Sequence, residues 1–152
     1  MTTIEADQIL RMSRTILVID WPSRDVPDSL ARAGFTVVVQ GGPGPDDYSA
    51  YEVKGDEVIE RAAGRSPSHV DLVYSYRPIE ELPDIAAMAK SIGATAMWIQ
   101  SGLAPGGAKD PKGTWMTKEM SGTARKIIEA AGLVYVDQPY IADVARTPGG
   151  QR

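Results

Sequence analysis

The chain contains no cysteine and a single histidine, His69, among its 152 residues. Without cysteine it has no disulfide, no thiolate zinc site and no cysteine nucleophile. A metal centre built from other ligands needs several histidines or clustered carboxylates. The densest acidic pairs, Asp46-Asp47 and Glu80-Glu81, are explained by solvation of a loop and of a helix start. We therefore expect no metal site.

Two further absences bear on catalysis and on the choice of cofactor. His69 precedes the third apolar run, so it lies at the sheet edge opposite the serines that follow the strands, and we expect no Ser-His pair. The Gly-x-Gly-x-x-Gly fingerprint of a dinucleotide site is missing, and Asp20 follows the first strand where such a site presents a glycine. We expect a protein that is not an enzyme and has no catalytic residues. An enzyme with a lid over a small acidic substrate ranks last, because no general base with a partner is in view.

The chain also has no long apolar run and no excess of basic residues. No stretch is long enough to span a bilayer, and the first residues show no basic region followed by an apolar stretch. A net charge of -4 argues against binding to nucleic acid or to an anionic membrane. The length and the 43% apolar content fit one domain over residues 1–152. We expect a cytoplasmic protein of bacterial type.

The most informative pattern that is present occurs three times. Gly34, Gly93 and Gly132 each end a helical pattern and lead directly into a β-rich run. Glycine adopts the left-handed conformation that ends a helix without a steric penalty. The runs that follow are apolar on both faces, as expected for strands of a parallel sheet that is covered by helices.

Strands that alternate with helices in this way predict an α/β fold. Right-handed crossovers leave few other arrangements than a Rossmann-like three-layer αβα domain. We expect a mostly parallel sheet of about five strands, at residues 15–20, 35–39, 70–74, 94–100 and 133–136.

The connecting segments give more specific predictions. The helix after the first strand has Pro27 in its first turn and either Asp25 or Ser23 as its N-cap. Residues 56–63 have helical spacing, and a later helical pattern covers residues 123–131. The stretch 104–121 is long and locally basic, so we interpret it as an inserted loop, and we expect residues 147–152 to fray.

The candidate binding residues follow the strands, because parallel sheets bind ligands beyond the carboxyl ends of their strands. Arginines there suit phosphates, aromatic rings suit a base, and glycines allow the backbone to approach a ligand closely. Each glycine also has an ordinary interpretation as a turn residue. The predicted cleft consists of Trp21, Pro22, Ser23, Arg24, Gly41, Gly42, Tyr76, Arg77, Pro78, Ser101 and Gly102.

Several of these segments resemble a known family in their order and in their amino-acid sequence. Residues 7–146 are similar to the small bacterial CoA-binding proteins, which are stand-alone relatives of the CoA-binding domain of the succinyl-CoA synthetase alpha subunit. The resemblance is carried by Ile16-Leu17-Val18-Ile19, Val70-Asp71-Leu72-Val73 followed by Arg77-Pro78, Leu82-Pro83-Asp84-Ile85, and above all Ile92-Gly93-Ala94-x-x-Met97-Trp98-Ile99-Gln100-x-Gly102.

The resemblance implies a Rossmann-type domain that binds CoA or an acyl-CoA along the strand ends and has no catalytic residues of its own. The departures fall in the site: Asp20 replaces the family's glycine after the first strand, and Gly41-Gly42 replace its Asn-Pro after the second. The function expected is therefore non-enzymatic binding of CoA, an acyl-CoA or a related nucleotide. The alternative is a divergent domain that has lost the ligand and acts through protein-protein interaction, as a homo-oligomer or with a partner bound by the 104–121 insertion.

Overall fold

A computed structural model describes residues 6–19, 24–41, 47–63, 66–77, 79–100, 117–137 and 140–147. Within these ranges one sheet has the strand order β4-β3-β2-β1-β5-β6-β7. Its strands are β1 (Thr15–Ile19), β2 (Thr36–Gln40), β3 (Tyr48–Lys54), β4 (Glu57–Ala62), β5 (Leu72–Ser75), β6 (Ala96–Ile99) and β7 (Val134–Val136). The helices of the same ranges are α1 (Ala6–Met12), α2 (Asp25–Arg32), the short 3-10 helix η1 (Ile79–Glu81), α3 (Leu82–Ser91), α4 (Lys118–Ala130) and α5 (Ile141–Ala145).

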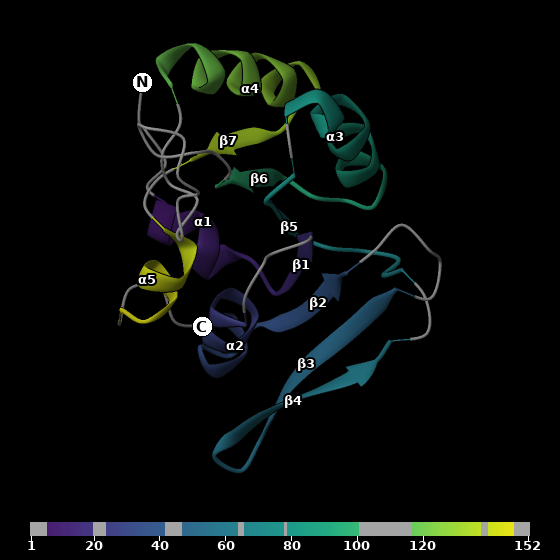
Figure 1. Cartoon of the computed structure of the whole chain (residues 1–152), viewed down its shortest axis with the longest axis vertical. Coiled ribbons are helices and arrows are strands. Elements are labelled where there is room, and N and C mark those ends of the chain that lie inside the picture. Colours follow the sequence, from purple (N-terminus) through teal and green to yellow (C-terminus); the bar gives the residue numbers. More distant parts are fainter. Residues whose placement is uncertain are drawn as a thin grey trace.

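The sheet is mostly parallel and lies between two layers of helices, which confirms the predicted three-layer fold. β1 pairs in parallel with β2 and with β5, and β5 continues in parallel through β6 to β7. Figure 1 shows the strands following one another from β7 to β4 along the long axis of the molecule. The domain contains seven described strands rather than about five, because β3 and β4 extend the sheet as an antiparallel hairpin beside β2.

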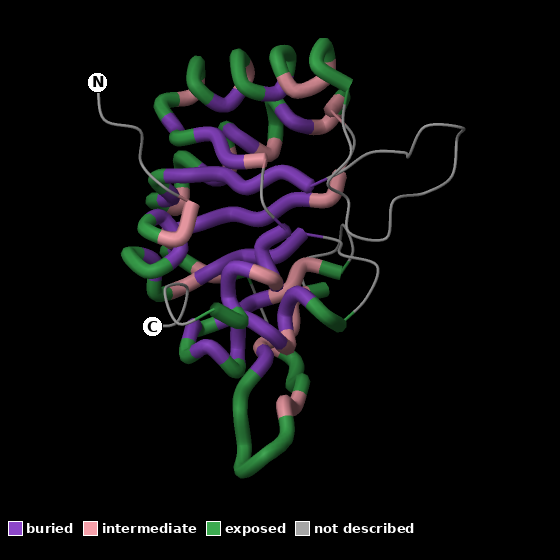
Figure 2. Tube along the Cα trace, turned by 90° about the vertical axis from the view of Figure 1, so that its left-hand side faces the viewer, coloured by how far each residue is buried: buried purple, intermediate pink, exposed green. Residues whose placement is uncertain are grey.

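Each strand of the central sheet contributes side chains to both cores. Ile16 and Val18 pack in the core that α1, α2 and α5 cover, whereas Leu17 and Ile19 pack in the core beneath α3 and α4. This follows from the alternation of side chains along a strand. It explains why the run has no polar alternation, as predicted for a strand covered on both faces. Figure 2 shows the central strands buried and the outer end of the β3–β4 hairpin exposed.

The three helix-ending glycines adopt the predicted conformation. The φ angles of Gly34, Gly93 and Gly132 are 102°, 92° and 84°. In the first of them the Gly34 N–H donates to the Ala31 carbonyl, and the next N–H donates back to Leu30. These bonds satisfy carbonyls that the end of a helix leaves open, and they aim the chain into the following strand.

The prediction of a helix over residues 56–63 is wrong, because this segment forms β4. Gly55, with a φ of 65°, reverses the chain after β3, and Lys54 is then opposite Glu57 in an antiparallel ladder. The apolar pair Val58 and Ile59 suits either a helical stripe or the two faces of a strand. The turn and the neighbouring strand decide between them.

Two further boundaries differ from the prediction. The N-cap of α2 is Arg24, whose side chain makes no capping hydrogen bond, so Asp25 is the first helical residue and not the cap. Pro27 does lie in the first turn. α4 begins at Lys118, with the Thr117 hydroxyl accepting a hydrogen bond from the Met120 N–H, so the end of the predicted 104–121 insertion belongs to a helix. The rest of the insertion, residues 104–116, lies outside the described residues.

None of the helices in the described part of the chain is long and apolar enough to cross a membrane.

Candidate functional site

The chain changes direction across the sheet between β1 and β5. From β1 it passes through α2 to β2 on one side, and it later returns to place β5 on the other side of β1. The segments that follow β1 and β5 therefore diverge over opposite faces, which creates the crevice where α/β sheets bind ligands. The Tyr76 N–H donates to the Ile19 carbonyl at 3.2 Å, and the Gln100 N–H donates to the Ser75 carbonyl at 3.3 Å. The ends of β1, β5 and β6 are thus tied side by side.

Four of the predicted site residues can be placed in the structure. Gly41 comes directly after β2, and Tyr76 and Arg77 come directly after β5, whereas Arg24 is the N-cap of α2, the helix that follows β1. The predictions for Trp21, Pro22, Ser23, Gly42, Pro78, Ser101 and Gly102 lie outside the described residues.

Arg77 is held in a bidentate ion pair at the end of β5. Its Nε lies 3.2 Å from Glu81 Oε1 and its Nη2 lies 2.6 Å from Glu81 Oε2. The backbone N–H of Arg77 also donates to Ser75 Oγ at 3.1 Å, which shapes the turn out of the strand. The pair is partly exposed, so solvent screens it. The guanidinium is therefore fixed near the end of β5 without being sealed in the core.

Arg24 is anchored toward α2 and the hairpin. Its Nη2 donates to Asp28 Oδ1 at 3.2 Å and to the Val58 carbonyl at 3.1 Å, and its guanidinium carbon lies 5.1 Å from the centre of the Tyr51 ring. Cation–π contact and two hydrogen bonds thus fix this side chain beside β3 and β4. Arg24 therefore lies at the start of α2, and its head group is directed to the β3–β4 hairpin.

Tyr76 and Gly41 complete the described part of the predicted cleft. Tyr76 is half-buried and packs against the core covered by α1, α2 and α5. The Gly41 N–H donates to the Asp47 carbonyl at 2.9 Å, so these two residues lie side by side. A Cβ built on Gly41 would meet no heavy atom within 4 Å, so protein packing does not demand a glycine there.

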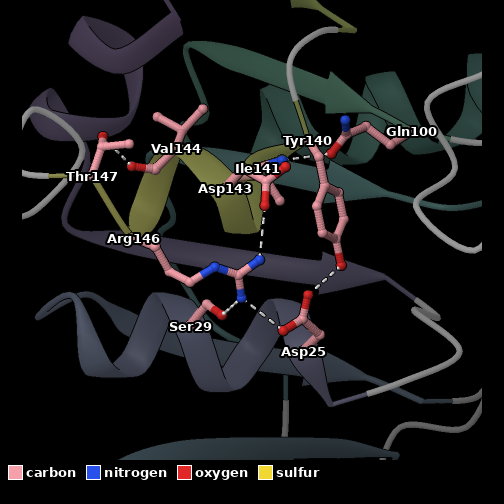
Figure 3. A network of polar contacts seen from close by, with 9 residues as sticks. All are labelled: Asp25, Ser29, Gln100, Tyr140, Ile141, Asp143, Val144, Arg146 and Thr147. Carbon is pink, nitrogen blue, oxygen red and sulfur yellow. Dashed lines mark hydrogen bonds and ion pairs between the residues drawn. The ribbon is translucent and has the colours of Figure 1, made fainter.

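A polar network that the sequence analysis did not identify joins α2 to α5 (Figure 3). The carboxylate of Asp25 accepts hydrogen bonds from the Tyr140 hydroxyl and from Arg146 Nη1, each at 2.8 Å. Arg146 also donates to Ser29 Oγ at 3.0 Å and to Asp143 Oδ1 at 2.9 Å. No local pattern signals these contacts, because 115 and 121 positions separate Asp25 from its two partners.

The network shifts the pKa values of Asp25 and Tyr140. Partial burial by itself raises the pKa of Asp25, but the hydrogen bonds from Arg146 and Tyr140 outweigh it and hold that pKa below its ordinary value. Burial and the nearby Asp25 carboxylate raise the pKa of Tyr140, so its hydroxyl remains a donor. An open groove of about 600 Å³ adjoins the network and is lined by Arg24, Asp25, Asp28, Ser29, Arg32, Ala33, Ala145 and Arg146.

Gln100 links the end of β6 to α5. Its side chain is fully buried, and its Oε1 accepts hydrogen bonds from the Tyr74 hydroxyl at 2.9 Å and from the Ile141 N–H at 2.8 Å. The residue belongs to the strongest motif of the sequence resemblance, which assigned it no role. Its signal in the sequence is a polar side chain at the end of an apolar strand.

His69 lies at the opposite edge of the sheet, as predicted. Its Nε2 is 3.1 Å from Asp71 Oδ1, and Asp71 Oδ2 accepts hydrogen bonds from the N–H groups of Arg14 and Thr15. This cluster joins the starts of β1 and β5, so it is structural. Within the described ranges no group of three histidine, aspartate or glutamate side chains is arranged to hold a metal ion.

A mostly parallel sheet with this change of direction, covered by helices on both faces, defines a Rossmann-like three-layer domain. A family model described as CoA binding domain matches residues 19–142, from the last residue of β1 into α5. The chain belongs to the CoA binding domain family, as the sequence resemblance implied, and a CoA-related ligand is the one that this family indicates. A search of the curated proteins gives no match.

The described residues at the crevice fit such a ligand in their chemistry. CoA carries phosphate groups and an adenine ring, which bind to cations, N–H donors and flat side chains. Arg77 places a partly exposed guanidinium group after the end of β5, and Tyr76 beside it supplies a half-buried ring. Asp25, the first residue of α2, carries a negative charge like a phosphate, but it forms an ion pair with Arg146.

Proposed function

We propose that this protein binds CoA, an acyl-CoA or a related nucleotide in the crevice at the carboxyl ends of β1, β2, β5 and β6, and that it catalyses no reaction. The observation that carries the proposal is the extent of the family match, since residues 19–142 include every segment that follows one of these strands. Family membership supports a CoA-related ligand, and the strand order supports the place that we propose for it.

The roles that we assign follow from the chemistry of these residues. The Arg77 guanidinium and the partial positive charge at the N-terminal end of α2 would attract phosphates, and the Tyr76 ring would lie against the base. The non-enzymatic part of the proposal is supported by the position of His69. This side chain pairs with Asp71 at the opposite edge of the sheet and offers no base to the crevice.

Calorimetric titration of the whole chain with CoA, acetyl-CoA, ADP and NAD tests the proposal. We expect CoA and acetyl-CoA to bind and NAD to bind more weakly. Arg77→Gln should weaken CoA binding by roughly tenfold or more, since a hydrogen bond to a charged group contributes about 1.5–3 kcal/mol. Arg61→Gln is the matched control, because Arg61 forms a comparable exposed ion pair with Glu52 on the distant β3–β4 hairpin.

Absence of binding to all four ligands at millimolar concentration would overturn this function. The competing function, protein-protein interaction through the inserted segment, would then remain.

This competing function predicts that deletion of residues 104–116 changes the molar mass measured by light scattering or abolishes capture of a partner. The deletion stops before Thr117 so that the N-cap of α4 is kept.

A further inference from the structure

β4 is the outermost strand at one edge of the sheet. The strand order ends at β4, and in the described part of the chain β3 is its only neighbour. Figure 1 shows β4 as the last strand at one end of the molecule, and Figure 2 shows the outer end of the hairpin exposed. The free edge of such a strand offers N–H and C=O groups to another strand.

Alternate residues of β4 direct their main-chain groups away from β3. The Ala63 N–H, directly after β4, donates to the Tyr48 carbonyl of β3 at 2.9 Å, so the odd-numbered residues face the hairpin partner. The Val58 carbonyl instead accepts Nη2 of Arg24 at 3.1 Å, and Arg24 lies outside the hairpin. That carbonyl has a second lone pair and can still accept another bond. The outward groups belong to Val58, Glu60 and Ala62.

The outward groups restrict how β4 can pair with β4 of a second copy. They must lie opposite one another, so the antiparallel registers differ by steps of two residues. One of these registers places Ile59 opposite Ile59, Val58 opposite Glu60 and Glu57 opposite Arg61. A step in one direction places Glu60 opposite Glu60 of the second copy, and a step in the other places Asp56 opposite Glu60. Both of those registers bring like charges together, and the first alone pairs opposite charges.

The charged side chains of that register are already ordered within the hairpin. Glu57 and Arg61 are exposed and lie on the same face as Ile59. Lys54 of β3 is opposite Glu57, and the Glu52 carboxylate binds Arg61 Nη2 at 2.6 Å. Across the joined hairpins the charges would alternate, from Lys54 and Glu57 of one copy to Arg61 and Glu52 of the other. Opposite charges in cross-strand pairs stabilise a sheet, and like charges destabilise it.

We propose that this chain forms a two-fold symmetric dimer in which β4 pairs antiparallel with β4 of a second copy, with Ile59 on the axis. The symmetry makes the Glu57–Arg61 pair occur on both sides of the axis. Charged residues on an exposed edge usually prevent strands from pairing. Here they are self-complementary in one register, so they select a second copy of this chain. The dimer joins two sheets into one and leaves the proposed CoA crevice open, because β3 separates β4 from β2.

Analytical ultracentrifugation of the whole chain tests the inference. One strand pair is a small interface, so we expect a weak dimer that dissociates on dilution, and loading from about 10 μM to about 1 mM covers weak association. Glu57→Arg and Arg61→Glu should each raise the dissociation constant by roughly tenfold or more, because like charges then face each other on both sides of the axis. Lys126→Glu, an exposed charge reversal on α4, is the matched control and should leave the dimer unchanged.

An equimolar mixture of the two reversed variants separates complementarity from loss of folding. In a mixed dimer the new arginine of Glu57→Arg faces the new glutamate of Arg61→Glu, and the unchanged Arg61 and Glu57 face each other. We therefore expect the mixture to dimerise within a few-fold of the wild type, although each variant alone does so weakly. A variant that had merely lost its fold would not recover on mixing.

Three results would overturn the inference: a wild type that stays monomeric up to about 1 mM, reversed variants that dimerise as well as the wild type, or a mixture no better than its components. If circular dichroism shows that a reversed variant does not fold, Glu57→Gln and Arg61→Gln decide. Both should weaken the dimer, and an unchanged dissociation constant for both would overturn the inference.

The dimer and the proposed function fail in different measurements. Molar mass reports on β4, whereas calorimetry with CoA reports on the crevice. Arg61→Gln should change the first and not the second, so it remains a valid control for the CoA titration. Deletion of residues 104–116 should leave the dimer intact, and a dimer lost with that segment would contradict pairing through β4.

Discussion

The hydroxyl of Tyr74 and the side-chain oxygen of Gln100 form a buried hydrogen bond of 2.9 Å across the neighbouring strands β5 and β6. Both side chains are fully buried, and burial keeps the pKa of Tyr74 well above its ordinary value, so this hydroxyl is a donor. The same oxygen of Gln100 also accepts the Ile141 N–H. One amide group thus satisfies two buried donors.

Gln100→Leu should therefore lower the free energy of unfolding by about 2–4 kcal/mol, because it leaves two buried donors without this acceptor. Urea unfolding measures the effect. Tyr74→Phe should cost less, and the double variant should cost less than the sum of the single changes. A loss below about 0.5 kcal/mol for Gln100→Leu, as for an ordinary surface substitution, would contradict the role given to the amide.

Acid should weaken the contact between α2 and α5. The pKa of Asp25 is lowered from an ordinary value of 3.8, despite an opposing contribution from burial. A carboxyl group whose pKa is lower when folded stabilises the protein above its unfolded pKa, and this contribution is lost as pH falls through the folded pKa. Thermal melting should show Asp25→Asn less stable than wild type near pH 6, with the difference shrinking below about pH 4. A difference that stays constant down to pH 2 would contradict this.

Two glycines should respond to alanine in opposite directions. Gly93 has a φ of 92°, and a Cβ there would lie 2.4 Å from His69 Nδ1, so Gly93→Ala should cost about 1–2 kcal/mol or more. Gly122 lies inside α4, and a Cβ there would meet nothing within 4 Å, so Gly122→Ala should stabilise by about 0.5–1 kcal/mol. Unfolding in urea compares the two, and the same sign for both would refute the argument.

Releasing Arg77 from its internal partner should favour the ligand. Glu81→Gln keeps the shape of the side chain but removes the charge that holds the guanidinium at 2.6 Å. We expect CoA to bind roughly two- to fivefold more tightly, in keeping with the small free energy of an exposed ion pair. Glu52→Gln, which releases Arg61 on the hairpin, should leave affinity unchanged. Unaltered or weaker binding with Glu81→Gln would show that Arg77 does not contact the phosphates.

The parallel half of the sheet could be predicted because its signals are local. Gly34, Gly93 and Gly132 end helices through their own backbone conformation, and the strands after them are apolar on both faces. The hairpin could not be predicted in the same way. The spacing of Val58, Ile59 and Ala62 fits a helix as well as a strand, and pairing with β3 decides the outcome.

For the candidate site too, the local sequence predicts the position of a residue but not the orientation of its side chain. That Arg24, Gly41 and Tyr76-Arg77 all follow parallel strands could be read from the sequence, because every strand of a parallel sheet ends at one edge. Their orientations could not, since Arg24 is turned by Val58 and Tyr51 on the hairpin and Arg77 by Glu81. These contacts depend on how the elements pack.

The amino-acid sequence by itself determined the fold class, the family and the edge of the sheet where we propose the ligand site, because helix ends, buried strands and family motifs are properties of consecutive residues. Only the tertiary structure decided that Asp25 is compensated by Tyr140 and Arg146, and that Gln100 orients α5. The reason is physical: a hydrogen bond depends on the distance between two atoms, and for residues 115 or 121 positions apart that distance is set by the packing of every element between them.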